Sequence, residues 1–209
     1  MHQAVETLKC VASYYDYVFI FSEVNENCLL KMGVKNVQCL LPCYDPNVFN
    51  PIGYEKKFKI SFLGQFDYLF DILGNTRKEY CLELEKEFFH DAFVGKGFYA
   101  EEANQVYNES LIALDLPIMS VIGPRSFSIG ATTAMLMLPS TLKSNLWLRS
   151  FNPEMDYVSF DGVGDLKEKI KYMVKRPEEC LKISQRMNKK MLRHTYKERF
   201  KEILSLVLN

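Results

Sequence analysis

Arg125 is the side chain whose sequence neighbours best suit it to bind an anion. It follows Gly123 and Pro124, a pair typical of a tight turn, and it precedes a segment that we predict to be helical. A guanidinium and the free backbone N–H groups at a helix start both bind phosphate. The alternative is a plain strand-to-helix turn that carries a surface arginine, and the local sequence leaves both interpretations open.

A second arginine, Arg77, has a comparable setting. Gly64 ends a predicted strand, and Thr76 and Arg77 open the next predicted helix. Glycine has no side chain, so a ligand can approach the backbone closely at Gly64. Arg77 could reach a phosphate of such a ligand, or it could pair with Glu79 or Glu83 nearby.

A third candidate is Gly95-Lys96-Gly97, which follows a short predicted strand. A lone Gly-x-Gly is a weak signal. The segment lacks the Gly-x-x-x-x-Gly-Lys-Ser/Thr of a P-loop, and it lacks the complete dinucleotide-binding pattern. Gly95 and Lys96 therefore remain candidate binding residues because of their position beyond the end of a strand.

Cysteine and histidine suggest little chemistry. A zinc site needs about four clustered ligands at short spacing, and the sequence shows no such cluster. No Ser-His-Asp or Cys-His pair can be placed from spacing, and His194 joins two predicted helices, where we expect no catalytic group. We expect reduced, buried thiols in a cytoplasmic protein. The six cysteines are Cys10, Cys28, Cys39, Cys43, Cys81 and Cys180.

A regular alternation of strands and helices must position these candidates. Short apolar strands, each followed by a helix, predict a Rossmann-like, doubly wound, mostly parallel α/β sheet. Such sheets bind ligands beyond the carboxyl ends of their strands, where Gly64, Gly95 and the loop before Ser126 fall. The apolar run 17–21 is expected to be buried on both faces, and Trp147 is expected to be a packing anchor. Strands are predicted at 17–21, 36–41, 58–63, 92–94, 111–114, 135–138 and 157–160, and helices at 4–15, 23–32, 76–89, 101–108, 126–134, 164–175, 177–193 and 195–207.

Composition indicates an ordinary globular chain. It has 209 residues, of which 48% are hydrophobic and 25% are charged, with a formal net charge of zero. No apolar run approaches the ~18 residues of a membrane span, and the first residues do not resemble a secretory signal. The balanced charge gives no reason to expect nucleic-acid binding.

The last helices depart from this balance. Residues 167–201 contain 13 Lys/Arg and 4 Asp/Glu. The simple interpretation is a solvated helix surface. The other interpretation is a surface for anionic lipid or for an acidic partner, and thus a peripheral membrane contact.

Four segments carry a resemblance to a known family. The stretch 21–49 is similar to the last strands of an amino-terminal domain and the crossing into a second domain. Ile-Ser-Phe-Leu-Gly at 60–64, followed by Arg77, is similar to a first donor-domain strand, glycine loop and arginine. Gly-Pro-Arg-Ser-Phe-Ser-Ile-Gly-Ala at 123–131 is similar to an Arg-x-Phe-Glu helix start, and 166–199 is similar to a family ending. In this order the segments resemble the carboxyl-terminal half of GT-B glycosyltransferases, most closely the group related to the spore-maturation protein CgeB.

The resemblance implies a donor domain that binds a nucleoside-diphosphate sugar. It implies no metal and no other cofactor, because helix dipoles and basic side chains hold the diphosphate. Arg77 and Arg125 would contact the phosphates, and Gly64 would let them approach. Phe127 and Ser128 belong to the matched helix start, with Ser128 placed for a ribose or sugar hydroxyl.

The sequence departs from the family at the same helix. Ser128 stands where the family has a Glu, Ser120 stands where related enzymes have a second Glu, and Thr133 replaces a glycine. Serine can hydrogen-bond but supplies no carboxylate, so we expect altered or weaker donor binding.

The resemblance also implies a division of the chain. Residues 1–50 correspond to the end of the amino-terminal GT-B domain with the linker, which includes three prolines within 42–51, and 51–209 correspond to the donor domain with its carboxyl-terminal helices. Two Rossmann-like domains need about 300 residues, so the acceptor site and the catalytic base are not assigned.

Two functional predictions follow. The first is a cytoplasmic, metal-independent glycosyltransferase, and the alternative is a non-catalytic nucleotide-sugar-binding or scaffold subunit of a glycosyltransferase complex. In either case a partial first domain would expose sheet edge and apolar surface, so we expect a partner chain or self-association to cover it.

Overall fold

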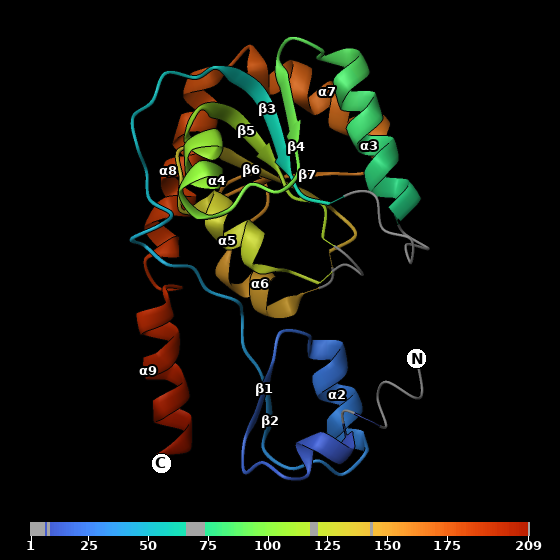
Figure 1. Ribbon diagram of the computed structural model, residues 1–209, viewed down its shortest axis with the longest axis vertical. Helices are drawn as coiled ribbons and strands as arrows, with labels where there is room; N and C mark the ends of the chain where they lie inside the picture. The colour runs from blue at the N-terminus through green and yellow to red at the C-terminus, as the bar shows by residue number, and fades with distance from the viewer. Residues whose placement is uncertain (1–6, 8, 66–73, 118–120, 143, 209) are drawn as a thin grey trace.

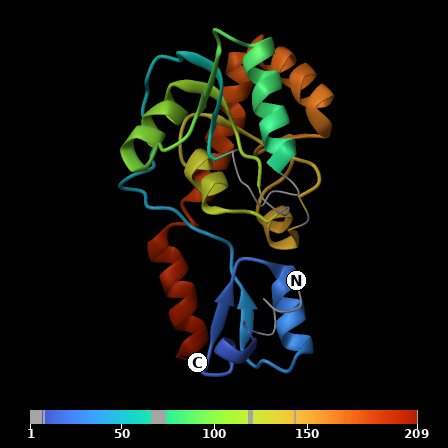
Figure 2. The same cartoon turned by 45° about the vertical axis from the view of Figure 1, so that its right-hand side comes forward.

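The fold was analysed in a computed structural model, which describes residues 7, 9–65, 74–117, 121–142 and 144–208. Figure 1 shows a larger unit built on a five-stranded sheet and a smaller unit built on a two-stranded sheet. The chain passes from the smaller unit to the larger one, and its last helix returns to lie beside the smaller unit (Figures 1 and 2).

The larger sheet is parallel throughout. Its strands are arranged in the order β4-β3-β5-β6-β7, and every neighbouring pair is parallel. The predicted doubly wound α/β fold is therefore confirmed. The strands are β3 (Phe58–Leu63), β4 (Ala92–Gly95), β5 (Ser110–Leu114), β6 (Met135–Pro139) and β7 (Val158–Phe160).

Helices cover both faces of this sheet, which is why its strands are mostly apolar, although Lys59 near the start of β3 is exposed. On one face Phe62, Leu114 and Met137 pack against helices α3 and α7. On the other face Leu63 and Leu136 pack against α4, α5 and α6, and α8 contributes to both cores. The helices are α3 (Gly74–Glu87), α4 (Ala100–Asn108), α5 (Pro124–Gly130), α6 (Asn145–Ser150), α7 (Gly162–Val174) and α8 (Pro177–Met191).

Strands β3 and β5 are neighbours in the sheet although β4 lies between them in the sequence. The chain therefore runs to one side of β3 first and to the other side afterwards. In open α/β sheets the crevice at such a reversal, outside the carboxyl ends of the strands, is the usual ligand site. A ligand is therefore expected to bind near the segments that follow β3 and β5.

The smaller unit has a core of four buried side chains. Strands β1 (Val18–Ile20) and β2 (Val37–Cys39) pair in parallel, and α2 (Glu23–Lys31) connects them. Ser22 caps α2 by accepting a hydrogen bond from the Asn25 backbone N–H, as predicted. Among the described residues, the cluster consists of Ala12, Leu29, Val34 and Val37, and Cys39 of β2 is buried as well.

Two predictions about this unit are wrong. The run 17–21 was expected to be buried on both faces, but all three residues of β1 are partly exposed and Phe21 is 60% exposed. The reason is that the two-stranded sheet buries little surface of its own, so apolar strand residues remain in contact with solvent. For the same reason the prediction of buried thiols is wrong here for Cys10, which is exposed, and for Cys28, which is partly exposed.

The chain passes between the two units twice, once in segment 42–51 and once in the segment before the last helix, and the two passages lie side by side. Segment 42–51 is irregular, as its prolines predict, and Tyr44 pairs with the segment that leads into α9 (Tyr196–Val207). The Tyr44 N–H donates to the His194 carbonyl at 3.2 Å, and the Tyr196 N–H donates to the Tyr44 carbonyl at 3.0 Å. Helix α9 then runs along β1 and β2, which lie between it and α2 (Figures 1 and 2).

Two helices differ from prediction. Helix α5 begins at Pro124, a residue suited to a first helical position, and it ends at Gly130 instead of continuing to 134. Helix α6 was not expected, because six residues are too few to show a helical period, although Ser144 caps it by accepting from the Trp147 N–H at 3.2 Å. Within the part of the chain that is described, no helix combines the length and apolar character needed to cross a bilayer.

Candidate functional site

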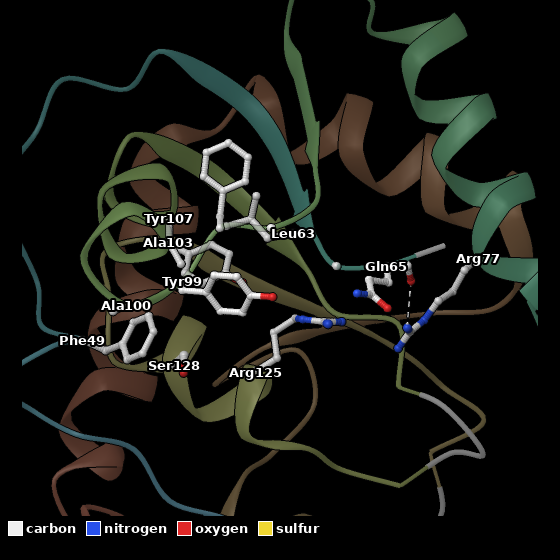
Figure 3. Close-up of a pocket in the computed structure, with 13 residues that line it drawn as sticks. Phe49, Leu63, Gln65, Arg77, Tyr99, Ala100, Ala103, Tyr107, Arg125 and Ser128 are labelled. Atoms are coloured by element: carbon white, nitrogen blue, oxygen red, sulfur yellow. Dashed lines mark hydrogen bonds between the residues drawn. The ribbon is translucent and has the colours of Figure 1, made fainter. Parts of the chain in front are cut away.

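A cavity of about 420 Å³ opens beyond the carboxyl ends of β3 and β4, beside α4 and α5. Figure 3 shows the side chains that surround it. Its lining residues are Phe49, Leu63, Gly64, Gln65, Arg77, Gly97, Phe98, Tyr99, Ala100, Ala103, Tyr107, Arg125 and Ser128. The structure thus brings together four of the predicted site residues, Gly64, Arg77, Arg125 and Ser128.

Arg125 projects from the first turn of α5 and is restrained on three sides. Its Nη1 lies 3.0 Å from Oδ1 of Asp115, and its Cζ lies 5.4 Å from the centroid of the Phe62 ring. Its Nη2 occupies the space beside Gly64, where an added Cβ would come within 2.7 Å. Gly64 therefore makes room for the Arg125 side chain, and this is the close approach that its lack of a side chain permits.

Asp115, the first residue after β5, was missed by the sequence analysis. Its carboxylate is buried, and its second oxygen accepts a hydrogen bond from the Ser126 hydroxyl at 2.6 Å. A single acidic residue directly after a buried apolar strand was the signal available, because that position must lie at the carboxyl edge of the sheet.

Arg77 comes from the first turn of α3 and is tied to the backbone. Its Nε donates to the Leu116 carbonyl at 2.7 Å, and its Nη1 donates to the Gln65 carbonyl at 3.2 Å. The guanidinium therefore links the segment after β3 to the segment after β5. Figure 3 shows Arg77 and Arg125 pointing toward one another with Gln65 between them.

The suggested carboxylate partner Glu83 is engaged elsewhere. It accepts from Lys167 on α7 at 2.8 Å, and the bond lowers the pKa of the Glu83 carboxyl. This pairing ties α3 to α7.

Phe127 does not line the cavity. It is fully buried, and its ring centroid lies 5.5 Å from those of both Trp147 and His194. Trp147 is also fully buried, so its predicted packing role is confirmed. Phe127 thus anchors α5 in the core while its neighbours Arg125 and Ser128 face the cavity.

Gly95 and Lys96 are likewise outside the cavity lining. The Gly95 carbonyl accepts from the Gly64 N–H at 2.9 Å, and a Cβ at Gly95 would come within 2.7 Å of the Phe98 ring. Gly95 therefore serves the packing of β4 against β3, and Lys96 is exposed. From this segment the cavity takes Gly97 and Tyr99 instead.

Of the other two family departures, Thr133 does not line the cavity. Ser120 lies outside the described residues. The Thr133 hydroxyl accepts from Lys56 Nζ at 2.8 Å, and its N–H donates to Asn108 Oδ1 at 3.1 Å. Burial lowers the pKa of the Lys56 ammonium to about 8. Thr133 thus helps to fix the linker against the sheet.

The described lining of the cavity is cationic. It includes two arginines and no carboxylate, since Asp115 lies behind Arg125. Burial raises the pKa of the Tyr107 hydroxyl, which keeps that lining group neutral at ordinary pH. Within the described ranges, no three His, Cys, Asp or Glu side chains are grouped so as to hold a metal ion. Such a cavity suits an anionic ligand with apolar and hydrogen-bonding parts.

The sequence matches one family model, described as glycosyl transferase-like, over residues 58–205. A comparison with curated proteins finds no match. The matched range includes the five strands of the larger sheet and most of α9.

Solved structures share the fold at low sequence identity. TarM of S. aureus is 9% identical with a TM-score of 0.70, over 98% of this chain and 46% of that one. Alr3699/HepE of Anabaena, solved with UDP, is 8% identical with a TM-score of 0.69, and the match covers 97% of this chain and 67% of that one. Sucrose-phosphate synthase of Thermosynechococcus elongatus is 10% identical with a TM-score of 0.67, over 100% and 62%. The chain thus spans about half to two thirds of the length of these proteins.

Proposed function

The chain belongs to the glycosyl transferase-like family, and from this premise we propose that it transfers a sugar from a nucleoside-diphosphate sugar to an acceptor. The donor diphosphate would bind in the cavity beyond the carboxyl ends of β3 and β4. The observation that carries the proposal is Arg125, a guanidinium held in place beside a glycine at the reversal point of the sheet.

Chemistry and fold both support this assignment. A planar guanidinium binds phosphate oxygens through two parallel hydrogen bonds. The similar fold of Alr3699/HepE was solved with UDP and with UDP-glucose, so a diphosphate-linked sugar is a reasonable ligand for the equivalent cavity here.

The finer assignments are also proposals. We propose that transfer needs no bound metal, because Arg125 and Arg77 supply positive charge at the cavity. We place the enzyme in the cytoplasm and in the CgeB-related group of GT-B enzymes. We keep the division at residue 50, which falls in the linker between the two sheets.

The test is calorimetry with UDP, GDP, ADP and CDP sugars. Arg125→Ala should weaken binding of the best ligand at least tenfold, since a charge-assisted pair is worth about 1.5–3 kcal/mol. Lys182→Ala removes an exposed cation far from the cavity and should leave binding unchanged. If millimolar concentrations of all four ligand classes give no heat and no thermal stabilisation, the proposed function is wrong.

A non-catalytic role is the second candidate, and Ser128 favours it. This residue lines the cavity but supplies no carboxylate for a sugar hydroxyl. The distinguishing measurement is turnover under conditions where the donor is bound. Binding without hydrolysis or transfer would identify a nucleotide-sugar-binding subunit.

A peripheral membrane contact is proposed for the surface of α8 and α9. Four exposed cations follow helical spacing along α8 and its end, and none has a carboxylate within ion-pair distance in the described structure. The exposed apolar side chains of Leu192, Tyr196 and Phe200 continue this surface onto α9. The four cations are Lys182, Arg186, Lys189 and Arg193.

Liposome sedimentation tests this surface. Binding should require anionic lipid and should weaken as salt rises, because the attraction to the headgroups is screened. Binding that ignores salt, or no binding at all, would contradict the proposed contact.

A partner chain or a second copy is proposed for the smaller unit. Phe21 and Val24 expose most of their apolar surface there, and β1 and β2 form a sheet of two strands with open edges. Uncovered edges and apolar patches favour association. A monodisperse monomer in light scattering would contradict this proposal.

A further inference from the structure

We propose that Asp115 is a positioning residue, which holds the Arg125 guanidinium in the orientation that binds the donor diphosphate. The inference rests on the proposed function and adds a residue to its site. Asp115 does not line the cavity, so it would act through Arg125 and not by touching the ligand.

Both oxygens of the Asp115 carboxylate are used on the same helix. Oδ1 pairs with Arg125 Nη1 at 3.0 Å, and Oδ2 accepts from Ser126 Oγ at 2.6 Å. Arg125 and Ser126 are consecutive residues in the first turn of α5, so one carboxylate fixes both the side chain and the turn that carries it.

Asp115 is itself fixed to the sheet. Its N–H donates to the Met137 carbonyl of β6 at 3.1 Å, and the residue is 2% exposed. A buried side chain at the end of a buried strand has little freedom to move. The orientation of Arg125 is therefore set by the buried sheet as well as by the helix that carries it.

The remaining contacts leave part of Arg125 for a ligand. Phe62 faces the guanidinium and Gly64 lies beside Nη2, while the side chain keeps 27% of its surface exposed and lines the cavity. An arginine ordered before binding loses less conformational entropy when the ligand arrives. Ordering by Asp115 should therefore increase affinity for a diphosphate.

Asp115 could have a different role, in which its negative charge merely neutralises Arg125 and so lowers the affinity for an anion. The two roles predict opposite effects of removing the carboxylate. If Asp115 only neutralised Arg125, both Asp115→Ala and Asp115→Asn would strengthen anion binding. If it positions Arg125, the alanine variant should weaken binding. The asparagine variant should retain it, because its amide oxygen can still accept from Nη1.

The experiment measures binding of inorganic pyrophosphate and of UDP by calorimetry. Asp115→Ala should weaken both about fivefold or more, and Asp115→Asn should stay within about twofold of the parent. Asp115→Ala is also combined with Arg125→Ala. The double variant should bind both probes within about twofold of Arg125→Ala alone, because Asp115 acts through a side chain that is already absent. Asp115→Ser replaces the alanine variant if that protein does not fold, since its shorter side chain also loses the contact with Arg125.

Asp156 provides the matched control. It is also 2% exposed and pairs with a cation, Lys190, at 2.5 Å, but it does not line the cavity. Asp156→Ala should lower stability as a buried-pair variant does and leave pyrophosphate and UDP affinity unchanged.

The outcomes separate the inference from the function beneath it. A parent protein that binds neither probe overturns both. A parent that binds, with Asp115→Ala equal or tighter, overturns only the inference. If Asp115→Ala weakens ligand affinity by the same factor in the parent and in the Arg125→Ala variant, the inference is also overturned. The loss of affinity would then come from a general structural change and not from Arg125.

Discussion

The two sheets of this molecule are built from similar sequence but differ in burial. Strand β5 and strand β1 are both short, apolar and parallel to their neighbours. The residues of β5 are almost all buried, whereas those of β1 are all partly exposed. An apolar strand therefore specifies the kind of element, while the neighbouring strands and the closeness of the helix packing decide how far it is buried. Helix α9 runs beside β1 and β2 but has no buried residue of its own.

The difference shows where stability and binding can be expected. The larger sheet has two continuous cores, and the candidate site is attached to its rigid end. The described part of the smaller unit has one small apolar cluster of four buried side chains. We therefore expect the larger unit to unfold cooperatively, and the smaller unit to unfold locally at a lower free energy.

The largest effect is expected from Phe127→Ala. The ring is fully buried between α5 and α6, so its removal should cost roughly 3–5 kcal/mol of unfolding free energy and loosen the cavity helix. Urea denaturation measures the loss. Phe21→Ala, at an exposed aromatic of the smaller unit, is the control and should change stability by less than about 1 kcal/mol. Similar losses in both variants would remove the distinction between the two regions.

Leu29→Ala should destabilise the smaller unit by roughly 2–5 kcal/mol, because it empties the centre of a four-residue core. Hydrogen exchange should accelerate in β1, β2 and α2 and remain slow in β5 and β6. Equal acceleration in the larger sheet would show that the two units unfold together.

His194, where the units meet, should make stability depend on pH. Burial, followed by the charges of Arg199 and Arg193, lowers its pKa from 6.5 to about 4. Between these values the unfolded chain binds a proton that the folded chain does not, so stability should fall as pH decreases from about 6.5 to about 4 and level off below. Because carboxylates titrate as well, the measurement is the difference in urea midpoint between the parent and His194→Gln across this range. A difference that stays constant with pH would contradict the prediction.

The smallest effect concerns the start of α9. Thr195 caps this helix by accepting from the Glu198 N–H at 3.3 Å, and Thr195→Ala should cost about 1 kcal/mol. Lys201→Met breaks only an exposed pair with Glu198 and should cost less than about 0.5 kcal/mol. Thermal unfolding of both variants checks the order.

Element types and the fold class were predictable because apolar periodicity and turn residues are local signals. Strand β3 begins and ends where predicted, and Ser22 and Thr195 cap their helices as expected. Burial of β1 was not predictable, since it depends on how much of the molecule surrounds a strand and not on the strand itself.

The candidate site was predictable only in part. Gly64, Arg77, Arg125 and Ser128 follow strands or start helices, and parallel topology brings such positions to one edge. The sequence could not separate Phe127 from its neighbours, because the direction of each side chain depends on the exact start of α5. It also gave no reason to connect Asp115 with Arg125 before their distance was known.

The crossing at Tyr44 and Thr195 also has a mechanical consequence. The chain passes between the units once outward and once back, and backbone hydrogen bonds join the two passages side by side. A domain connected through a single chain segment can rotate about three axes. Two chain segments held together leave chiefly one rotation axis, which runs through the crossing. Rotation about this axis would have to break a further contact between the units, in which the Glu23 carboxylate of α2 accepts from the Asn145 N–H of α6 at 2.7 Å.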